Sequence, residues 1–363
     1  MSQYIIRDFK ESDKDQVISL LQSAFDPNMT REYWDWLYKK NPNGYYIVVS
    51  EADSEIVGND GFIPLRMKIG KQELMAVFNA SLVVSPKHRG KGVFLKMGTY
   101  ATTQLAEAQK LVCVGFPNET AHPGHLKYGW FTVSSMPKLV KFMNGRALLR
   151  TKKAQAFLKK YHLGKLRFVL QPFSALMLKL INLRAQVKFR IEQGQEKYEV
   201  STSSTPFPRE MDSLWLRVKD GYEILTVRDK KYLDWRFHEC PDRKYFLLTG
   251  KKNEELVGYL VAAQENELGL ILDVFGEPNS AFLDVLIREA TSLLKKRGVG
   301  KIVARVTSSS EAYKAFQHNG WFAQESIPII ARVNTLRETR ETEKLKAYLS
   351  NPSHWFMTAS DNL

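Results

Sequence analysis

Hydrophobic and polar residues follow two similar patterns along the chain, one in each half. Alternation with a period of two predicts half-buried strands, and apolar residues three and four positions apart predict amphipathic helices. In the first half these patterns predict strands over 4–7, 46–50, 56–64, 76–84 and 111–115, and helices over 13–25 and 92–110. In the second half they predict strands over 198–201, 270–274 and 301–306, and helices over 208–218 and 282–297. This order predicts an α+β fold in which each half has a mixed, mostly antiparallel sheet, flanked by helices around a central β-α-β unit.

Two motifs recur in the same order in both halves, which indicates a tandem duplication. Residues 33–38 read Tyr-Trp-Asp-Trp-Leu-Tyr, and residues 232–237, 199 positions later, read Tyr-Leu-Asp-Trp-Arg-Phe. A second match, 191 positions apart, sets Ala121, Gly129 and Trp130 against Ala312, Gly320 and Trp321. A period this long indicates repeated domains and not a solenoid. We therefore expect an N-terminal domain over 1–138, a basic helical linker over 139–191 and a C-terminal domain over 192–363.

A basic turn rich in glycine follows the apolar strand that ends at Val83 and Val84. The turn and the helix start that comes after it comprise Arg89, Gly90, Lys91, Gly92, Val93 and Phe94. A strand, a glycine-rich turn and a helix N-terminus present several free N–H groups to one point, at the positive end of the helix dipole. Such a point binds a phosphate or pyrophosphate. The alternative is an ordinary strand-to-helix turn with surface cations.

The net charge of +14 is concentrated in one segment of the chain. Between Glu119 and Glu192 there are fifteen Lys or Arg and no acidic residue, so the rest of the chain is close to neutral. Apolar residues at helical spacing over 169–183 predict an amphipathic helix within this segment. Two interpretations stay open: a linker with a solvated basic face, or a surface that binds an anionic membrane or an acidic carrier. Nucleic acid is a weaker candidate because no recognised binding module is present.

Two cysteines, Cys113 and Cys240, have no metal-ligand spacing and predict a reducing compartment. The first residues of the chain lack a signal-peptide core, and no apolar run reaches the roughly 18 residues of a membrane span. We therefore expect a cytoplasmic protein, with peripheral attachment at the inner face of the membrane if the basic segment binds lipid. No metal site is expected.

The turn and a later motif resemble those of the Gcn5-related N-acetyltransferase (GNAT) superfamily, in its two-domain bacterial form. Motif A of that family follows a strand as Arg/Gln-x-x-Gly-x-Gly/Ala, and here it reads Arg-Gly-Lys-Gly-Val-Phe over 89–94. The family's later motif is Asn-x-x-Ala-x-x-x-Tyr-x-x-x-Gly-Phe. Asn118, Ala121, His125, Gly129 and Trp130 occupy those spacings. The match covers nearly all of 1–136 and, more weakly, 198–335.

The resemblance implies that acetyl-CoA, or another acyl-CoA, is the co-substrate. Its pyrophosphate would bind the backbone amides of residues 89–94, and Asn118 would also belong to the co-substrate site. Its pantetheine arm would pair with the strand edge at Val83 and Val84, whose N–H would polarise the thioester carbonyl. An amine then attacks directly, with no covalent enzyme intermediate.

The resemblance leaves the proton-transfer groups less defined. His125 stands where the family has the Tyr that protonates the departing thiolate, and an imidazole suits that role near neutral pH. The alternative for His125 is simple packing on the sheet. The candidates for the general base are Glu119, which we rank first, Asp60 and His122. Two further residues, Asn79 and Ser81, are suited only to orient a water.

The second half lacks the first half's chemistry. Its corresponding turn, over 275–280, reads Phe-Gly-Glu-Pro-Asn-Ser, which places an acidic residue and a proline where pyrophosphate would bind. Phe316 stands opposite His125 and Ser309 opposite Asn118. We therefore expect the second domain to shape the acceptor site in a monomer that contains an internal pseudo-dimer.

The leading functional hypothesis is an acetyl-CoA-dependent N-acetyltransferase that acts on a small primary amine. An amino sugar of surface polysaccharide biosynthesis is the acceptor suggested by analogy with two-domain relatives. One alternative is transfer of a longer acyl chain, from acyl-CoA or acyl carrier protein, at the membrane. Another is a non-catalytic binding protein with a vestigial CoA site.

Overall fold

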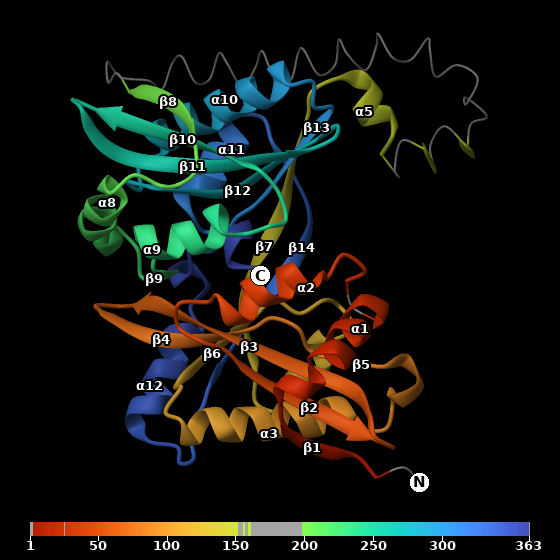
Figure 1. The fold of residues 1–363 in the computed structure, drawn as a ribbon. Helices are drawn as coiled ribbons and strands as arrows, with labels where there is room; N and C mark the ends of the chain where they lie inside the picture. The colour runs from red at the N-terminus through yellow and green to blue at the C-terminus, as the bar shows by residue number, and fades with distance from the viewer. Residues whose placement is uncertain (1–2, 25, 152–154, 157–158, 161–197, 363) are drawn as a thin grey trace.

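The computed structural model describes residues 3–24, 26–151, 155–156, 159–160 and 198–362. Their strands form one fourteen-stranded sheet that runs through two lobes, with the C-terminus between them (Figure 1). The order of the strands in the sheet is β1-β2-β3-β4-β6-β14-β7-β13-β12-β11-β10-β8, with β5 and β9 paired to β3. Within the described residues only β4–β6 and β12–β13 are parallel pairs, so the predicted mixed, mostly antiparallel sheet is confirmed.

The first half supplies seven strands and five helices of the described residues. The strands are β1 (Ile5–Asp8), β2 (Tyr46–Ala52), β3 (Glu55–Ile69), β4 (Gln72–Asn79), β5 (Val83–Val84), β6 (Val112–Gly115) and β7 (Phe131–Phe142). The helices are α1 (Lys14–Ala24), α2 (Arg31–Trp34), α3 (Val93–Glu107), α4 (His122–Leu126) and α5 (Gly145–Leu149). A π-helical turn, Asp35–Lys39, continues α2, and short 3₁₀ turns lie at Glu11–Asp13 and Pro86–His88.

The second half repeats most of this order. Its strands are β8 (Glu199–Ser204), β9 (Ile224–Thr226), β10 (Tyr245–Lys252), β11 (Glu255–Glu265), β12 (Leu268–Gly276), β13 (Lys301–Arg305) and β14 (Phe322–Val333). Its helices are α8 (Glu210–Val218), α9 (Lys230–Leu233), α10 (Ser280–Lys296), α11 (Glu311–His318) and α12 (Arg340–Leu349). The strand β9 is an additional strand between α8 and α9, and β5 has no counterpart in the described residues of this half. A π-helical turn, Asp234–His238, continues α9, and 3₁₀ turns lie at Lys219–Gly221, Pro352–His354 and Ala359–Asp361.

Each predicted strand and helix in the described residues is present, with one error that matters for the site. The single strand predicted over 76–84 is wrong, because β4 ends at Asn79 and the chain leaves the ladder before β5 begins at Val83. The helix predicted over 169–183 lies outside the described residues.

Two corresponding hairpins, one in each half, share the same backbone geometry although their turn residues differ. The hairpin turn at Asp53 and Ser54 has positive φ at both residues, and so does the turn at Asn253 and Glu254, 200 positions later. Both hairpins also contain a register shift at the same place, after Ser50 and after Gly250. Since positive φ is uncommon for such residues, we infer that these turns descend from one ancestral hairpin.

The two halves exchange their last strands. The first half's β7 pairs with β13, the second half's β14 pairs with β6, and β7 and β14 pair with each other between the lobes (Figure 1). The predicted boundary between 138 and 139 lies inside β7. Each lobe is therefore completed by a strand from the other half of the sequence.

The repeated Trp-containing turns meet where the lobes touch. The rings of Trp36 and Trp235 stack with centroids 5.2 Å apart and planes inclined by 18°. The Trp36 indole N–H donates to the carbonyl of Trp235 at 2.7 Å, and the Trp235 N–H donates to that of Trp36 at 3.2 Å. Equivalent residues that contact each other reciprocally lie on a pseudo-two-fold axis, as in a symmetric dimer.

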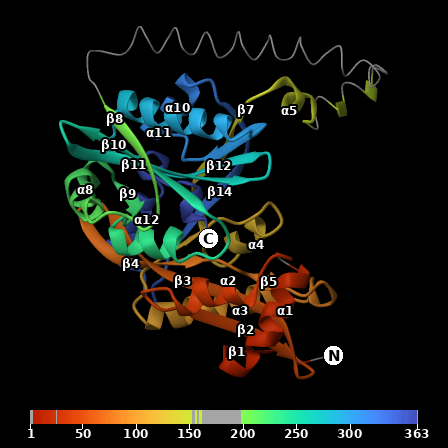
Figure 2. The ribbon, with the colours of Figure 1, turned by 45° about the horizontal axis from the view of Figure 1, so that its top comes forward.

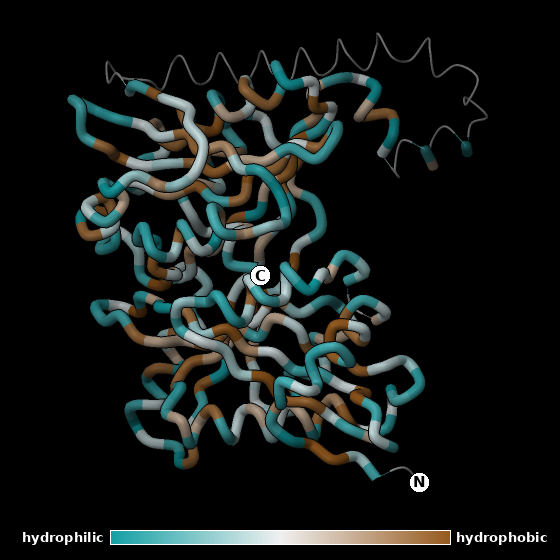
Figure 3. Tube along the Cα trace, in the orientation of Figure 1, coloured by the Kyte–Doolittle hydropathy of each residue, from teal (hydrophilic) through white to brown (hydrophobic). Residues whose placement is uncertain are grey.

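Hydrophobic residues line the interior strands of both lobes, and hydrophilic residues are common at the turns (Figure 3). In the lower lobe α3 packs on one face of the sheet through Val93, Met97, Ala101 and Leu105. The first helices, α1 and α2, cover the face that looks toward the upper lobe, as a second view also shows (Figure 2). Cys113 and Cys240 are buried free thiols whose pKa values are raised by burial, which disfavours the reactive thiolate.

Candidate active site

The candidate site begins where two parallel strands separate. β4 and β6 are paired up to Asn79 and Gly115. Beyond that point the chain turns away from β6 through Ala80–Leu82 and rejoins β3 as β5. The separation opens the sheet next to the start of α3, and it is formed by the chain break that sequence reasoning missed.

The turn before α3 leaves its backbone open to a ligand. Gly90 and Gly92 have φ of +74° and +79°, and a Cβ added at either would meet nothing within 4 Å. Gly92 is the N-cap of α3 and has no side-chain oxygen to accept from the first turn of the helix. The first N–H groups of α3 have no partner within the helix and lie at the positive end of its dipole, where an anion binds favourably.

Val84 lies between this turn and the strand separation. The Ser85 N–H donates to the Val57 carbonyl at 2.9 Å, so Ser85 and Val57 form a hydrogen-bonded antiparallel pair. Because such pairs alternate, Val84 and its partner Gly58 form a non-hydrogen-bonded pair, and the Val84 N–H points away from β3. Its carbonyl accepts from Nε of Arg89 at 3.0 Å, so Arg89 braces the end of β5.

Phe94, the bulky residue in the turn motif, packs against α4. Its ring meets the His125 imidazole edge to face, with centroids 5.3 Å apart. A Cβ on Gly124 would lie 2.6 Å from the Phe94 ring. The larger side chain is thus accommodated by a glycine on the opposing helix.

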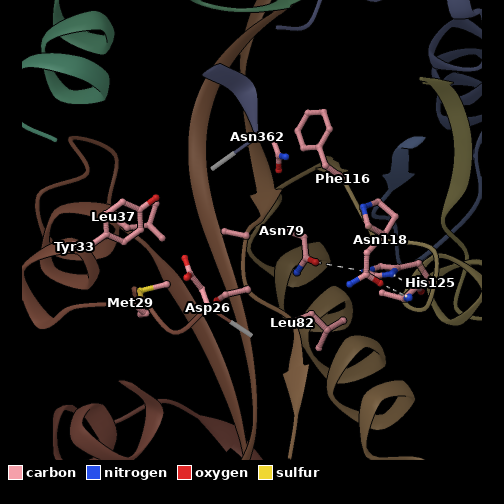
Figure 4. Close-up of a pocket in the computed structure, with 14 residues that line it drawn as sticks. Asp26, Met29, Tyr33, Leu37, Asn79, Leu82, Phe116, Asn118, His125 and Asn362 are labelled. Atoms are coloured by element: carbon pink, nitrogen blue, oxygen red, sulfur yellow. Dashed lines mark hydrogen bonds between the residues drawn. The ribbon is translucent and has the colours of Figure 1, made fainter. Parts of the chain in front are cut away.

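A cavity of about 420 Å³ opens beside these residues (Figure 4). Asn79 and His125 lie on one side of it, and the α1–α2 region contributes residues on the other (Figure 4). The lining residues are Asp26, Met29, Tyr33, Leu37, Asn79, Ala80, Ser81, Leu82, Phe116, Pro117, Asn118, Ala121, His125 and Asn362. Asp26 is the acidic residue of this set, and no Lys or Arg belongs to it.

His125 is held at the wall of the cavity by its own helix. Its Nδ1 lies 3.0 Å from the Ala121 carbonyl, which only accepts, so Nδ1 carries the proton. Its Nε2 lies 3.4 Å from Oδ1 of Asn79 (Figure 4). Burial lowers the pKa of His125 to about 4, so the imidazole is neutral near pH 7. A role as acid therefore requires that it first takes up a proton.

The other predicted site residues differ in how far they are buried and in whether they line the cavity. Asn118 lines the cavity and its Oδ1 accepts from the Ala121 N–H at 2.9 Å, which fixes the start of α4. Glu119 is exposed and does not belong to the lining set. Asp60, ranked lower from the sequence, is fully buried and accepts from Nδ2 of Asn79 at 2.5 Å.

The cavity-lining residues that are distant in sequence from the strand separation were not predicted from the sequence. Tyr33 and Leu37 belong to the duplicated aromatic turn. The repetition of this turn in both halves was the sequence signal that could have pointed to these two residues. Asn362 comes from the C-terminal segment, and no pattern in the sequence connects it to the strand separation.

In the second half other parts of the chain occupy the places that correspond to the glycine turn and the strand separation. Oδ1 of Asn279 accepts from the Ala281 N–H at 2.9 Å, so α10 is capped by its own side chain. The C-terminal segment fills the region next to the end of β12. Thr358 forms a bridge with Val306 and donates to Asp273 at 2.7 Å.

A buried ion cluster anchors this segment. The Arg228 guanidinium lies 3.3 Å from Asp273 and 2.8 Å from Asp361, and all three side chains are fully buried. Asp361 precedes Asn362, so the cluster fixes the part of the C-terminal segment that reaches the cavity of the first half.

Part of the basic segment is paired with the second half. Lys138 forms an ion pair with Glu325 at 2.9 Å, and Arg150 with Glu267 at 2.6 Å. Lys141 is partly buried and donates to the Asn319 carbonyl. These three cations therefore contribute to packing between elements. Most of the predicted linker lies outside the described residues.

Two features are absent from the part of the chain that the structure describes. None of its helices is both long and apolar enough to span a bilayer. It also contains no group of three or more His, Cys, Asp or Glu side chains arranged to hold a metal ion.

Comparison with known proteins gives one family and a group of similar folds. Residues 5–133 match the acetyltransferase (GNAT) domain family. No curated protein matches the chain in sequence. A probable N-acyltransferase of Enterococcus faecalis has a TM-score of 0.64 at 10% identity, covering 92% of this chain and 73% of that chain.

Two further solved structures have the same fold. A GCN5-related N-acetyltransferase of Anabaena variabilis has a TM-score of 0.63 at 10% identity and covers 92% of this chain and 74% of its own. The N-myristoyltransferase of Saccharomyces cerevisiae, solved with bound myristoyl-CoA, has a TM-score of 0.58 at 10% identity, with 92% and 83% covered.

The family match over residues 5–133 and the shared fold support an acyltransferase of the N-acetyltransferase (GNAT) type. The matched residues 5–133 contain the glycine turn and all the cavity-lining residues except Asn362, so this part of the chain is similar to the GNAT acetyltransferases.

Proposed function

We propose that this protein transfers an acetyl group from acetyl-CoA to a primary amine bound in the cavity beside His125. The observation that carries the proposal is the meeting of three features at the separation of β4 and β6. The open glycine turn, the outward-facing N–H of Val84 and the neutral His125 imidazole all adjoin it. The glycine turn suits a pyrophosphate, the Val84 N–H suits a thioester carbonyl, and the imidazole suits a reacting amine.

The proposed reaction needs no covalent enzyme intermediate. The neutral amine nitrogen attacks the thioester carbon, and the Val84 N–H stabilises the resulting oxyanion. Nε2 of His125 takes the proton that the amine loses, the carbon–sulfur bond breaks, and the same nitrogen returns the proton to the thiolate. The products are the N-acetyl amide and CoA thiol, so protons balance. An acceptor that arrives as an ammonium ion first releases one proton to solvent.

The charge of the cavity supports a cationic acceptor. Asp26 is partly exposed, and it is the acidic side chain among the lining residues. It would attract an ammonium group and disfavour an acceptor with a phosphate near its amine. An amino sugar without phosphate meets this condition, and so does an alkyl or aromatic amine, since Met29, Leu37 and Phe116 supply apolar surface.

The test is release of CoA thiol from acetyl-CoA and from myristoyl-CoA, measured against glucosamine, alkylamines and arylalkylamines. The variant His125→Phe copies Phe316, the residue at the equivalent place in the second half, and so preserves an aromatic ring in the packing. We expect it to lower kcat by about 10²- to 10⁴-fold, the usual contribution of a general acid–base, with the Kd of acetyl-CoA retained. Wild-type kcat in His125→Phe would refute the assigned role. Absence of thiol release with every amine would refute the proposed activity.

A further inference from the structure

Three polar side chains form a hydrogen-bonded chain from the interior of the sheet to the cavity. Asp60 lies on β3, Asn79 is the last residue of β4, and His125 lies on α4. The Asp60 carboxyl contacts Nδ2 of Asn79 at 2.5 Å, and Oδ1 of Asn79 contacts Nε2 of His125 at 3.4 Å. Asp60 is fully buried, its second oxygen Oδ2 has no partner, and the other two side chains line the cavity.

The donors and acceptors of this chain do not match in every protonation state. Nδ1 of His125 keeps its proton because it faces the Ala121 carbonyl. In the neutral imidazole Nε2 is then a bare acceptor, and the Asn79 oxygen that faces it is also an acceptor. The contact as drawn becomes a hydrogen bond only when Nε2 carries a proton. With Asp60 ionised, the arrangement therefore suits an imidazolium.

A half-turn of the Asn79 amide gives the complementary arrangement. The amide oxygen and nitrogen are similar in size, so exchanging them changes few packing contacts. In this orientation a protonated Asp60 donates to the Asn79 oxygen, and the Asn79 NH₂ donates to bare Nε2 of His125. In both arrangements each of the two contacts along the chain pairs a donor with an acceptor, and both hold one proton on the Asp60–His125 pair.

We propose that the Asn79 amide couples the ionisation of Asp60 to the proton on Nε2 of His125. Asp60 and Asn79 are then positioning residues. The carboxylate turns the amide oxygen toward the imidazole and favours a proton on Nε2, whereas the carboxylic acid turns the amide NH₂ toward it and keeps Nε2 bare.

The surroundings of Asp60 raise its pKa, so that the carboxyl changes its ionisation near neutral pH. Burial raises the pKa of Asp60 to about 7, and the hydrogen bond from Asn79 opposes that rise. The titratable groups around Asp60 are neutral acids with raised pKa values from four elements, namely Tyr38, Tyr46, Cys113 and Tyr128. The cation near Cys113 and Tyr128 is Arg332, which donates to the backbone carbonyl of Tyr128. His122 is the charged or titratable group that acts on His125 from its own helix.

The catalytic consequence rests on the proposed function, whereas the coupling is a property of these three side chains alone. While His125 holds the proton taken from the amine, an ionised Asp60 stabilises it through the Asn79 oxygen. A buried imidazole whose own pKa is about 4 would otherwise be a weak proton acceptor.

The test is a histidine-ring nitrogen NMR titration of the full chain labelled with ¹⁵N-histidine, without CoA or amine. His125 is assigned by the loss of its signals in His125→Phe. In the wild type we expect the Nε2 shift of His125 to change with an inflection near pH 7, while Nδ1 stays protonated. In Asp60→Asn, which mimics the protonated acid, and in Asn79→Ala, which removes the coupling amide, the inflection should disappear.

Two controls separate this coupling from other effects. Asp284→Asn alters a buried carboxylate in the second half that also accepts from an asparagine amide, that of Asn319 at 3.0 Å, and should leave the inflection unchanged. His122→Asn removes the neighbouring imidazole and should also leave it. If the inflection is absent in the wild type, persists in a folded Asp60→Asn or Asn79→Ala, or disappears in His122→Asn, the proposal is wrong. Because no substrate is present, this outcome does not depend on whether the enzyme acetylates amines.

Discussion

Replacing Gly92 by Asp tests the glycine turn as a pyrophosphate site. Gly92 has φ of +79° and open space where a Cβ would lie. Strain in the left-handed region costs about 1–2 kcal/mol for a residue with a side chain, less for Asp, so the fold should survive. The new carboxylate would stand near the diphosphate. Two unit charges roughly 6 Å apart repel by about 0.7 kcal/mol in bulk water and by about four times that at an effective dielectric constant of 20.

With two phosphate charges, the smaller value gives about 1.4 kcal/mol, or a tenfold rise in the Kd of CoA. Calorimetry with CoA measures this directly, and 1 M salt should recover part of the lost affinity because screening shortens the range of the repulsion. Gly298→Asp is the matched control, since Gly298 has φ of +83°, the same open surroundings and a place at the end of α10. Wild-type CoA affinity in Gly92→Asp, or an equal loss in Gly298→Asp, would refute the reasoning.

Four further outcomes follow from the structure. Gly124→Ala should cost about 1–3 kcal/mol in the free energy of unfolding by overpacking against Phe94, and Phe94→Ala in the same chain should recover part of it in urea denaturation. Arg228→Met should cost about 3–5 kcal/mol in the same assay, because it leaves two buried carboxylates without their cation. Asp26→Asn should raise KM for a cationic amine several-fold and leave the Kd of acetyl-CoA unchanged; an unchanged KM would remove Asp26 from acceptor binding. If the segment 139–191 binds anionic membranes, the chain should float with anionic liposomes at low salt and not at high salt, and failure to float leaves the linker interpretation.

The fold could be predicted because its signals are local. The helix α3 and its glycine turn lie within about twenty residues, and the duplicated Tyr-x-Asp-Trp turns repeat a local aromatic pattern. The break between β4 and β5 was missed because the whole run from Ala76 to Val84 is suitable for a strand. It ends at Asn79 because the chain keeps β3 as its neighbour but loses its pairing with β6, which is a tertiary event.

The ranking of Glu119 above Asp60 as a candidate base could not be checked from the sequence. How deeply a side chain is buried depends on tertiary packing and not on its sequence neighbours. Glu119 and Asp60 both lie near predicted motifs, yet one is exposed and the other has no exposed surface. A charged residue inside the predicted strand 56–64 was the available sign that Asp60 is unusual. The contribution of Asn362 depends on the anchoring of the C-terminal segment in the second half, more than two hundred residues from His125.

The exchanged strands bear on how the enzyme is made in the cell. All the residues of the glycine turn and of α4 emerge early in synthesis, but β6 remains an edge strand until β14 (Phe322–Val333) has been translated. Asn362 joins the cavity later still. Pairing over such sequence separation is also slow to form. A nascent chain therefore contains the complete glycine turn long before it has the completed sheet that holds the turn in place.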